Sequence, residues 1–484
     1  MSEVDPPRVD ETHLSWVFQA GDRAYKVLKP VTLPFLDHTT DEARIAAATA
    51  EFELNRRTAP DVYLGLADVH EGSRLVDRMI VMRRLPSDRR LSRLAAEGDI
   101  SGCLRDVARA VAVFHARQPP VAVAPMASAA AHLRNWHDNM DVTNALEGAG
   151  ASRRDLDRVR ELAVDYLAGR ERLFDRRIAE GFVRDGHGDL IADDVFCLDD
   201  GPRIIDCLAF DDDWRIGDVL LDIGFLVMDV HRLAGREPAQ RLLGWYQEFS
   251  GEHHPASLSH HYVAYRAHVR AKVACLRWQQ GDEASADLAM VYHDLALHHL
   301  EHGRVRLVMV GGVPGAGKTV LSEGLAGRLG CASLSTDELR KDVVGIGRGE
   351  RRPAAPGEGI YDDETRDAIY AEQLREAAAL LGQGESVVLD ASWTHEAHRE
   401  RARQVAAAAH AGLVEIECRV EPGLAKARIE RRRSDPSSVS DATAEVVDHL
   451  AGRRDPWPNA IPLDTTDSPE IVLERACGLI TGDR

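Results

Sequence analysis

The alternation of apolar and polar residues predicts strands near the start of the chain and helices soon after. Residues 12–29, THLSWVFQAGDRAYKVLK, contain two runs of β-forming residues around Ala20-Gly21-Asp22, which predicts a hairpin. Residues 41–57 have a helical pattern, and Leu75 to Met82 have a strand pattern. Helices are expected over residues 90–180 and 215–300, separated by short strands at Gly181 to Arg184 and Arg203 to Ile205.

A different pattern begins after Gly303. RLVMVGG (306–312) is a continuous apolar strand that runs into glycines, and a helix is predicted from Lys318. The strands SVVLDAS (386–392) and LVEIECRV (413–420) then alternate with helices, which is typical of a parallel α/β sheet. We therefore predict two domains, residues 1–303 and 304–484, within the 484 residues of the chain.

Charge narrows the range of partners. The chain has a net charge of −19; residues 304–484 hold 24 basic and 30 acidic residues, a net charge of −6, which leaves −13 for residues 1–303. Such an excess of acid disfavours nucleic acid and anionic membrane surfaces as partners. No apolar run approaches the 18 residues of a membrane span, and the acidic start MSEVDPPRVDE is unlike a signal peptide. We expect a cytoplasmic protein, and nothing in the sequence predicts its oligomeric state.

The cysteines support the same expectation. Seven are scattered along the chain, and none forms a C-x-x-C pair. This pattern favours reduced, buried thiols over disulfides or a zinc site.

The stretch GVPGAGKT (312–319) carries the clearest chemistry. It fits the phosphate-binding pattern G-x-x-x-x-G-K-[ST] and lies between a predicted strand and a predicted helix. Gly312, Gly315 and Gly317 allow backbone N–H groups to surround phosphate oxygens at a helix N-terminus. Lys318 would reach the terminal phosphates, and the Thr319 hydroxyl would bind Mg²⁺. The cofactors predicted are therefore ATP and Mg²⁺.

Other residues of this half could complete a transfer site. Asp390 ends an apolar strand, where it could hold magnesium or simply cap a helix. Asp337 could deprotonate a substrate hydroxyl or act as an N-terminal helix cap, and Arg340 lies one turn later. Arg428 and Arg432 are i, i+4 neighbours that could close over a transferring phosphoryl group or form a solvated basic face.

Taken together, these motifs resemble the small P-loop kinases. The features are the P-loop, S-T-D-x-x-R (335–340), V-V-L-D-A (387–391) and an Arg-rich segment before D-P-S (435–437). Gluconate kinase, chloramphenicol phosphotransferase, zeta toxin and the 5′-kinase part of polynucleotide kinase belong to this group. The resemblance implies phosphorylation of a hydroxyl by ATP, with Asp337 as base, Arg340 on the substrate and Arg428 or Arg432 in a lid.

The first domain contains HGDLIADD (187–194), which resembles the loop H-G-D-L-x-x-x-N of the aminoglycoside phosphotransferases, relatives of the protein kinases. The other family positions follow in order: Lys26 on a strand, Glu51 on the next helix, Met82 in the place of the adenine hinge, and Asp206 on a strand 17 residues after Asp189. Asp218 and Asp222 match acids that brace the catalytic loop.

This second resemblance implies the roles of the residues. Asp189 would accept the hydroxyl proton, Asp206 would bind Mg²⁺, and Lys26, held by Glu51, would neutralise phosphate charge. His187 is expected to be structural. Two departures stand out. Asp194 replaces the amide that serves as second magnesium ligand, and its oxygen could still bind the metal while adding negative charge. The hairpin has only Gly21 in place of a glycine-rich phosphate cover.

The acceptor is the least determined part of the site. FDDDW (210–214) could receive an amino group or sugar hydroxyls, or it could be a solvated acidic loop. Trp136 and Trp214 could stack on a sugar ring, although an isolated Trp more often serves packing.

The predicted fold class is α/β and α+β: a bilobal protein-kinase-like domain followed by a P-loop parallel sheet with helices on both faces. The predicted function is ATP-dependent phosphorylation of a small polar hydroxyl compound such as a sugar, amino sugar or aminoglycoside. Two alternatives stay open. One domain could be a pseudokinase that binds nucleotide and gates the other, or the chain could be a nucleic-acid 5′-end kinase, which its charge disfavours.

Overall fold

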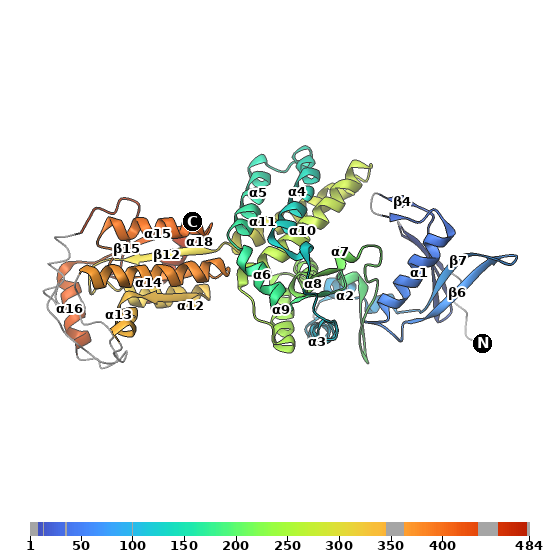
Figure 1. The fold of residues 1–484 in the computed structure, drawn as a ribbon, viewed down its shortest axis with the longest axis horizontal. Coiled ribbons are helices and arrows are strands. Elements are labelled where there is room, and N and C mark those ends of the chain that lie inside the picture. Colours follow the sequence, from blue (N-terminus) through green and yellow to red (C-terminus); the bar gives the residue numbers. More distant parts are fainter. Residues whose placement is uncertain are drawn as a thin grey trace. The chain divides into compact units, whose positions relative to one another are not determined.

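The computed structural model describes residues 8–12, 14–33, 36–98, 100–344, 363–433 and 454–481. The chain forms two compact units (Figure 1). The first contains residues 1–160, 174–254 and 259–300, and the second contains residues 161–173, 255–258 and 301–484.

The first unit begins with an antiparallel sheet in the order β1-β2-β3-β7-β6. Its strands are β1 (Arg8–Glu11), β2 (Ser15–Ala20), β3 (Arg23–Leu28), β6 (Tyr63–Glu71) and β7 (Arg74–Arg83). The predicted hairpin is confirmed, because β2 and β3 are joined by a two-residue turn in which Gly21 has a φ of 58°. The strand β6 was not expected from the sequence pattern. A two-stranded ribbon, β4 (Thr32–Leu33) with β5 (Leu36–Asp37), follows the hairpin.

Helix α1 (Asp41–Asn55) lies against this sheet. The Thr40 side chain caps it by accepting a hydrogen bond from the Ala43 N–H, and acids in the first turn favour the positive end of the helix dipole. Ala48 and Phe52 pack with Ile80 and Met82 in one apolar cluster. This packing fixes the angle at which α1 presents its other residues to the sheet.

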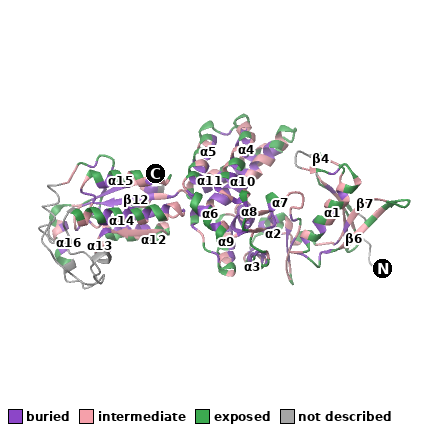
Figure 2. Ribbon diagram, in the orientation of Figure 1, coloured by how far each residue is buried: buried purple, intermediate pink, exposed green. Residues whose placement is uncertain are grey.

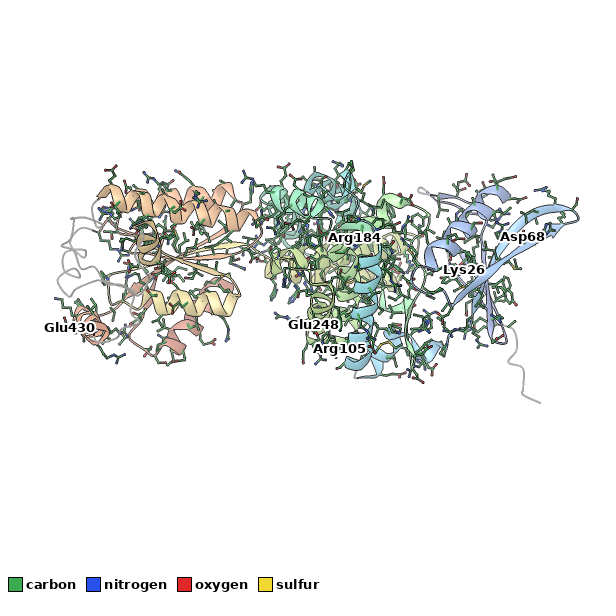
Figure 3. The ribbon with its side chains drawn as sticks, turned by 60° about the horizontal axis from the view of Figure 1, so that its bottom comes forward. Lys26, Asp68, Arg105, Arg184, Glu248 and Glu430 are labelled. Carbon is green, nitrogen blue, oxygen red and sulfur yellow. A yellow bond between two sulfur atoms is a disulfide. The ribbon has the colours of Figure 1, made fainter. Side chains whose placement is uncertain are left out.

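The rest of the first unit is mostly helical, as predicted. The helices between residues 91 and 302 are α2 (Leu91–Glu97), α3 (Ser101–Arg117), α4 (Ala129–Thr143), α5 (Arg153–Ala168), α6 (Glu171–Ala179), α7 (Asp212–Arg215), α8 (Val219–Ala234), α9 (Arg236–Ser250), α10 (Ala256–Gln279) and α11 (Ala284–His302). The end of α5, the start of α6, the start of α10 and the end of α11 belong to the second unit. Helices α3 and α9 pack against each other. A guanidinium nitrogen of Arg105 on α3 lies 3.5 Å from a carboxylate oxygen of Glu248 on α9 (Figure 3).

Two small antiparallel ribbons hold the loops between these helices. The first pairs β9 (Val195–Leu198) with β10 (Gly201–Ile204), and the second pairs β8 (Val183–Asp185) with β11 (Ile216–Asp218). The sequence pattern predicted β8 and β10 to within two residues but missed their partners. β9 and β11 are only four and three residues long, too short to show a period.

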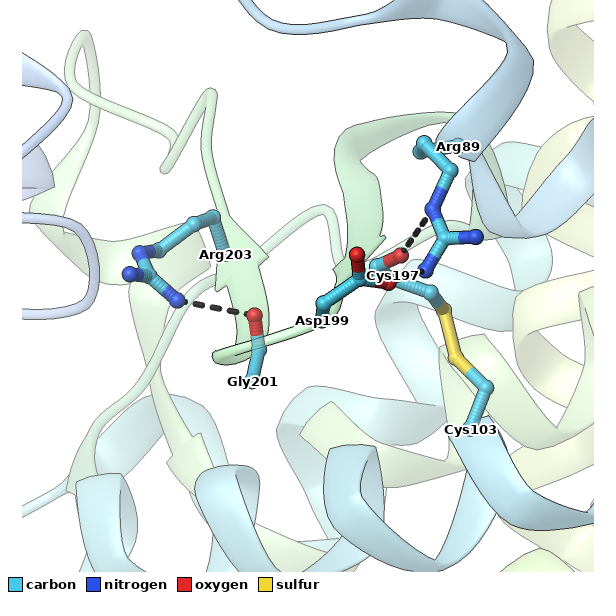
Figure 4. The surroundings of a disulfide bond; sticks show 6 residues. All are labelled: Arg89, Cys103, Cys197, Asp199, Gly201 and Arg203. Atoms are coloured by element: carbon cyan, nitrogen blue, oxygen red, sulfur yellow. Dashed lines mark hydrogen bonds and ion pairs between the residues drawn. A yellow bond between two sulfur atoms is a disulfide. The ribbon is translucent and has the colours of Figure 1, made fainter.

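The expectation that all cysteines are reduced is wrong for one pair. Cys103 on α3 and Cys197 on β9 form a disulfide between residues 94 positions apart, with Cα atoms 6.0 Å from each other (Figure 4). Sequence spacing gave no sign of it, because tertiary packing of α3 against β9 brings the two residues together. The other five cysteines are free.

The second unit contains a five-stranded parallel sheet in the order β13-β14-β12-β15-β16. Its strands are β12 (Arg306–Gly311), β13 (Ala332–Ser335), β14 (Val387–Asp390), β15 (Gly412–Arg419) and β16 (Ile461–Asp464). The helices are α12 (Lys318–Leu329), α13 (Thr336–Val344), α14 (Asp363–Gly382), α15 (Glu396–Ala408), α16 (Pro422–Arg433) and α18 (Pro469–Thr481).

Helices cover both faces of this sheet. Val308, Val310 and Val388 pack against α12 and α18 in one core cluster. Because side chains alternate along a strand, Leu307 and Met309 point to the opposite face, and they are also fully buried. Figure 2 shows β12 as buried between helices that also carry exposed residues, and β14 is buried along its whole length. The predicted P-loop architecture is therefore confirmed. None of the helices that the structure describes is long and apolar enough to cross a membrane.

Candidate active sites

Lys26 is the centre of the first site. It lies on β3 (Figure 3), with its ammonium nitrogen 2.8 Å from a Glu51 carboxylate oxygen on α1 and 2.5 Å from an Asp206 carboxylate oxygen. Burial would lower the pKa of Lys26, but Asp206 and Glu51 outweigh it and raise that pKa well above its usual value. The proximity of Lys26 lowers the pKa of Asp206 in turn. The arrangement keeps a cation and a carboxylate charged side by side.

Asp189 and Asp194 add two more acids to this place. Asp189 is partly exposed, and its carboxylate makes no hydrogen bond or ion pair with the residues that the structure describes. Asp194 ends the short 3₁₀ turn Ala192–Asp194. Burial, and then the negative charges of Asp206 and Asp189, raise the pKa of Asp194 well above its usual value. The negative charges of neighbouring carboxylates favour a cation near Asp194, although the described residues contain no group of three acids, histidines or cysteines arranged to hold a metal by themselves. Oxygen is the ligand atom that Mg²⁺ prefers.

Two acids on α8 hold the loop HGDLIADD (187–194) in place. Both oxygens of Asp222 accept hydrogen bonds, one from the His187 N–H and one from the Gly188 N–H, each 2.8 Å long. Asp229, further along α8, accepts from the Ala192 N–H at 3.0 Å. A side chain at Gly186 would collide with Asp222, since an added Cβ would lie 2.8 Å from its oxygen. The loop is thus fixed by main-chain contacts that leave Asp189 unengaged.

Asp218 has a different role from the one that the family resemblance implied. Its carboxylate pairs with Arg177 and caps α8 through the Leu220 N–H. His187 is buried, and its Nε2 lies 3.0 Å from the Ile205 carbonyl oxygen, which accepts a hydrogen bond from it. His187 thus links the start of the loop HGDLIADD to the segment after β10.

Sequence reasoning missed two arginines beside these acids. Arg90, at the start of α2, hydrogen-bonds to the Asp193 carbonyl and contributes positive charge at Asp194 and Asp206. Arg270 on α10 bonds to the Tyr292 side chain. Burial would lower the pKa of Arg270, but Asp189, Tyr292 and Asp229 outweigh it and raise that pKa. Neither arginine belongs to a motif, because each reaches the site from a helix distant in sequence.

The remaining predicted residues of the first domain lie around the site in different ways. Met82 is buried between Ala24 and Tyr63 in the sheet. In FDDDW, Asp211 caps α7 and Asp212 pairs with Arg215 at 2.7 Å, so two of the three acids have structural partners. Trp136 is fully buried and packs, whereas Trp214 is 54% exposed.

The second site is a glycine cradle between β12 and α12. Gly312, Gly315 and Gly317 have φ angles of 143°, 80° and 85°, which only glycine adopts readily. An added Cβ would lie 2.6 Å from the Cys418 carbonyl oxygen at Gly312 and 2.4 Å from that of Ala425 at Gly315. These close approaches leave no room for side chains, so the loop presents backbone N–H groups at the start of α12.

Lys318 and Thr319 follow directly on α12. The Lys318 ammonium donates a hydrogen bond to the Val313 carbonyl at 3.1 Å, across the loop. The Thr319 hydroxyl donates to an Asp390 oxygen at 2.7 Å. Burial raises the pKa of Asp390 to about 6, although Lys318 opposes the shift. The Thr319 hydroxyl and the Asp390 carboxylate therefore lie together beside the glycine loop, and both are oxygen ligands of the kind that Mg²⁺ prefers.

Asp337 and Arg340 form an ion pair near the same strand ends. The Arg340 guanidinium lies 2.7 Å from an Asp337 oxygen, and Asp337 is 42% exposed. Gln373 of α14 donates hydrogen bonds to the Leu334 and Asp390 carbonyls at 2.7 and 3.3 Å. One helix thus links the end of β13, which is followed by Asp337 on α13, to the end of β14, where Asp390 lies.

The two predicted lid arginines lie on α16. Arg428 donates to the Thr465 carbonyl at 2.8 Å, and its guanidinium passes 3.8 Å from a Cβ added at Gly317, so it lies beside the cradle. Arg432 lies in the last turn of α16, and its side chain is outside the described residues.

Known proteins match this chain over part of its length or over nearly all of it. The AAA domain family model matches residues 307–457. The uncharacterized protein Rv2004c of Mycobacterium tuberculosis (strain ATCC 25618 / H37Rv) is 38% identical over 478 residues, 98% of this chain and 95% of the relative. The uncharacterized protein Mb2027c of Mycobacterium bovis gives the same values.

Solved structures of kinases also resemble parts of this chain. A choline/ethanolamine kinase family protein from Mesorhizobium loti is 15% identical, with a TM-score of 0.39, and the match covers 62% of this chain and 93% of that one. A gluconokinase from Sinorhizobium meliloti 1021 is 18% identical, with a TM-score of 0.28, over 37% of this chain and 92% of that one.

Fold and sites together define a chain in which a kinase-like fold precedes a P-loop kinase fold. The chain belongs to the family of the two mycobacterial proteins, which it matches along almost its whole length.

Proposed function

We propose that this protein is an ATP- and Mg²⁺-dependent kinase with two transfer sites, one in each unit. Its acceptors would be hydroxyl groups of small polar metabolites such as sugars, amino sugars or aminoglycosides. The observation that carries the proposal is Lys26 between Glu51 and Asp206, beside the unengaged carboxylate of Asp189. A lysine held by a carboxylate next to two further acids is the arrangement that grips a nucleotide tail and its metal.

Both sites fit these cofactors. ATP supplies the phosphoryl group, and Mg²⁺ neutralises charge on the phosphates. In the first site Asp206 and Asp194 would hold the metal, and Lys26 would bind phosphate oxygens. In the second, the N–H groups of Gly312, Gly315 and Gly317 with Lys318 would hold the phosphates, and Thr319 and Asp390 the metal.

The chain's own residues would move the proton. Asp189 would accept the proton of the acceptor hydroxyl in the first site, since its carboxylate is unengaged by the described residues. Asp337 would do so in the second, where Arg340 holds its orientation. Arg428, beside the cradle, would offset charge on the transferring group.

The alternative, a pseudokinase that gates its neighbour, is favoured by one observation. Asp194 places an acid where an amide is usual, and burial with neighbouring charge raises the pKa of Asp194. An acid there increases the demand for metal and removes an amide donor from the loop. The first unit would then bind nucleotide without transferring phosphate.

An ADP-release screen over sugars, amino sugars and aminoglycosides separates the two possibilities. It compares the natural chain with Asp189→Ala and Lys318→Ala. Two active sites predict that each substitution abolishes one acceptor-dependent activity, by about 100-fold or more as for loss of a catalytic base or phosphate contact, and spares the other. A gating pseudokinase predicts that Asp189→Ala changes no turnover. Absence of acceptor-stimulated ADP release from the natural chain would overturn the kinase assignment, and oligonucleotide-stimulated turnover would support a 5′-end kinase.

A further inference from the structure

Three contacts join residues 55–63 to the segment that follows β10. Asp206 lies in this segment, two residues beyond the end of β10, and not on a strand as the sequence predicted. The Asp206 N–H donates to the Tyr63 hydroxyl at 3.2 Å, and the Cys207 N–H donates to the Asn55 side-chain oxygen at 2.9 Å. The Thr58 hydroxyl donates to the Ile204 carbonyl at 2.8 Å. Side chains of residues 55–63 therefore hydrogen-bond to the main chain at Asp206 itself and on both sides of it.

Asp206 needs such support because its backbone is unusual. Its φ is 65°, in the left-handed region that residues with a side chain seldom adopt. A residue keeps this conformation only when surrounding contacts over-determine it. Tyr63 is 1% exposed, so its ring cannot swing away and its hydroxyl is fixed opposite the Asp206 N–H.

The same helix that ends at Asn55 also carries Glu51, the partner of Lys26. Asn55 is one turn beyond Glu51, and its side-chain nitrogen donates to the Glu51 carbonyl at 2.9 Å. Asn55 is fully buried. One short stretch thus sets the position of Lys26 through Glu51 and that of Asp206 through Asn55 and Tyr63.

We propose that Tyr63 is a positioning residue of the first site: its hydroxyl holds Asp206 in the left-handed conformation from which the carboxylate faces Lys26 and can bind a divalent cation. This inference rests on the proposed nucleotide site. If it holds, metal binding at that site depends on Tyr63, which lies at the start of β6 and outside the sequence motifs.

A purely structural role for Tyr63 predicts a different response. Loss of a structural hydroxyl would lower stability alike with and without metal. Loss of a positioning hydroxyl would weaken nucleotide binding only where Mg²⁺ contributes to it, because Lys26 and the rest of the pocket stay in place.

The experiment measures ATP binding calorimetrically over a range of Mg²⁺ concentrations, in the full chain with Lys318→Ala to silence the P-loop. Tyr63→Phe keeps the ring and removes the hydroxyl. We expect the Mg²⁺ concentration for half-maximal binding to rise about fivefold, which corresponds to the ~1 kcal/mol net value of one hydrogen bond. Binding of ATP without metal should change less than twofold, roughly the effect of a remote surface change.

Tyr166→Phe is the matched control, since it removes another buried tyrosine hydroxyl, 3.3 Å from the Ser257 hydroxyl. It should leave the Mg²⁺ dependence unchanged. Amide hydrogen exchange of a peptide covering residues 203–208 should be faster in Tyr63→Phe alone. Equal Mg²⁺ dependence in Tyr63→Phe and its parent overturns the inference and leaves the kinase proposal intact. A parent that binds no Mg-ATP overturns both.

Discussion

At the scale of single residues, we expect Asp194 to set how strongly nucleotide binding in the first site depends on Mg²⁺. It shares its surroundings with Asp189 and Asp206, and these acids together with burial raise the pKa of Asp194. Replacing it with the amide found in related loops removes one negative charge without changing shape. We expect Asp194→Asn, with the P-loop silenced by Lys318→Ala, to keep nucleotide binding and to depend less on metal.

Calorimetry of ATP binding with and without Mg²⁺ measures this dependence. The ratio of the two affinities should fall several-fold, roughly the effect of one nearby charge in a partly solvated site. Asp193→Asn is a suitable comparison, because Asp193 is exposed and adjacent in sequence. Loss of all Mg-ATP binding in Asp194→Asn would show that position 194 needs the carboxylate itself, contrary to the role proposed here.

At the scale of helices, α4 and α10 bury histidines in a neutral state. His132 on α4 lies among three aromatic rings: its ring centre is 5.3 Å from that of Phe174, 5.5 Å from that of Tyr262 and 5.7 Å from that of Tyr265. Burial lowers the pKa of His132 to about 4 and that of His268, on α10, to about 3. In the unfolded chain both groups would titrate near pH 6.5.

These depressed pKa values make the packing of the helices sensitive to acid. Below about pH 6.5 these histidines bind protons in the unfolded chain but stay unprotonated in the folded chain. Their contribution to the free energy of unfolding is therefore fully present above this pH and is lost as the pH falls toward about 4. We expect a loss of at most about 1.4 kcal/mol per pH unit for each histidine. Urea unfolding at pH 7, 6 and 5 measures it, and His132→Phe should reduce the slope. Parallel slopes in both proteins would contradict the assignment of His132.

Local patterns were sufficient for much of the fold and for the outline of both sites. HGDLIADD and GVPGAGKT could be recognised because each concentrates its chemistry within eight residues, where loop geometry and residue type are directly linked. The hairpin and the parallel sheet followed from periods of two and from apolar runs. Strands of three or four residues show no clear period, so β8 and β10 were placed only to within two residues, and β9 and β11 were missed.

What the sequence could not supply are contacts between distant segments. The disulfide between Cys103 and Cys197, the electrostatic effect of Asp189 on Arg270 and the hydrogen bond from Asp206 to Tyr63 each link residues about 80 or more positions apart. Such contacts depend on how elements pack, which residue spacing does not encode. Asp218 shows the same limit, because Arg177 and the start of α8 engage it instead of the loop.

At the scale of the whole molecule, the two sites lie in two separately compact units. A ligand that binds only the folded form stabilises the unit that holds it, by about 2.7 kcal/mol at a concentration 100 times its Kd. We therefore expect Mg-ATP to raise the midpoints of two unfolding steps in the natural chain. Asp206→Ala should lose the shift of the first unit, and Lys318→Ala that of the second.

Thermal unfolding followed by proteolysis and mass spectrometry assigns each step to one unit by its fragments. Fragments from residues 1–160, 174–254 and 259–300 report on the first unit, and fragments from 161–173, 255–258 and 301–484 report on the second. Independent kinases predict that each substitution removes one shift and spares the other. If Asp206→Ala also reduced the shift of the second unit, nucleotide in one unit would alter affinity in the other. Because such coupling is reciprocal, Lys318→Ala would then have to weaken binding in the first unit by the same factor. That matched pair of losses would favour the gating pseudokinase over two independent kinases.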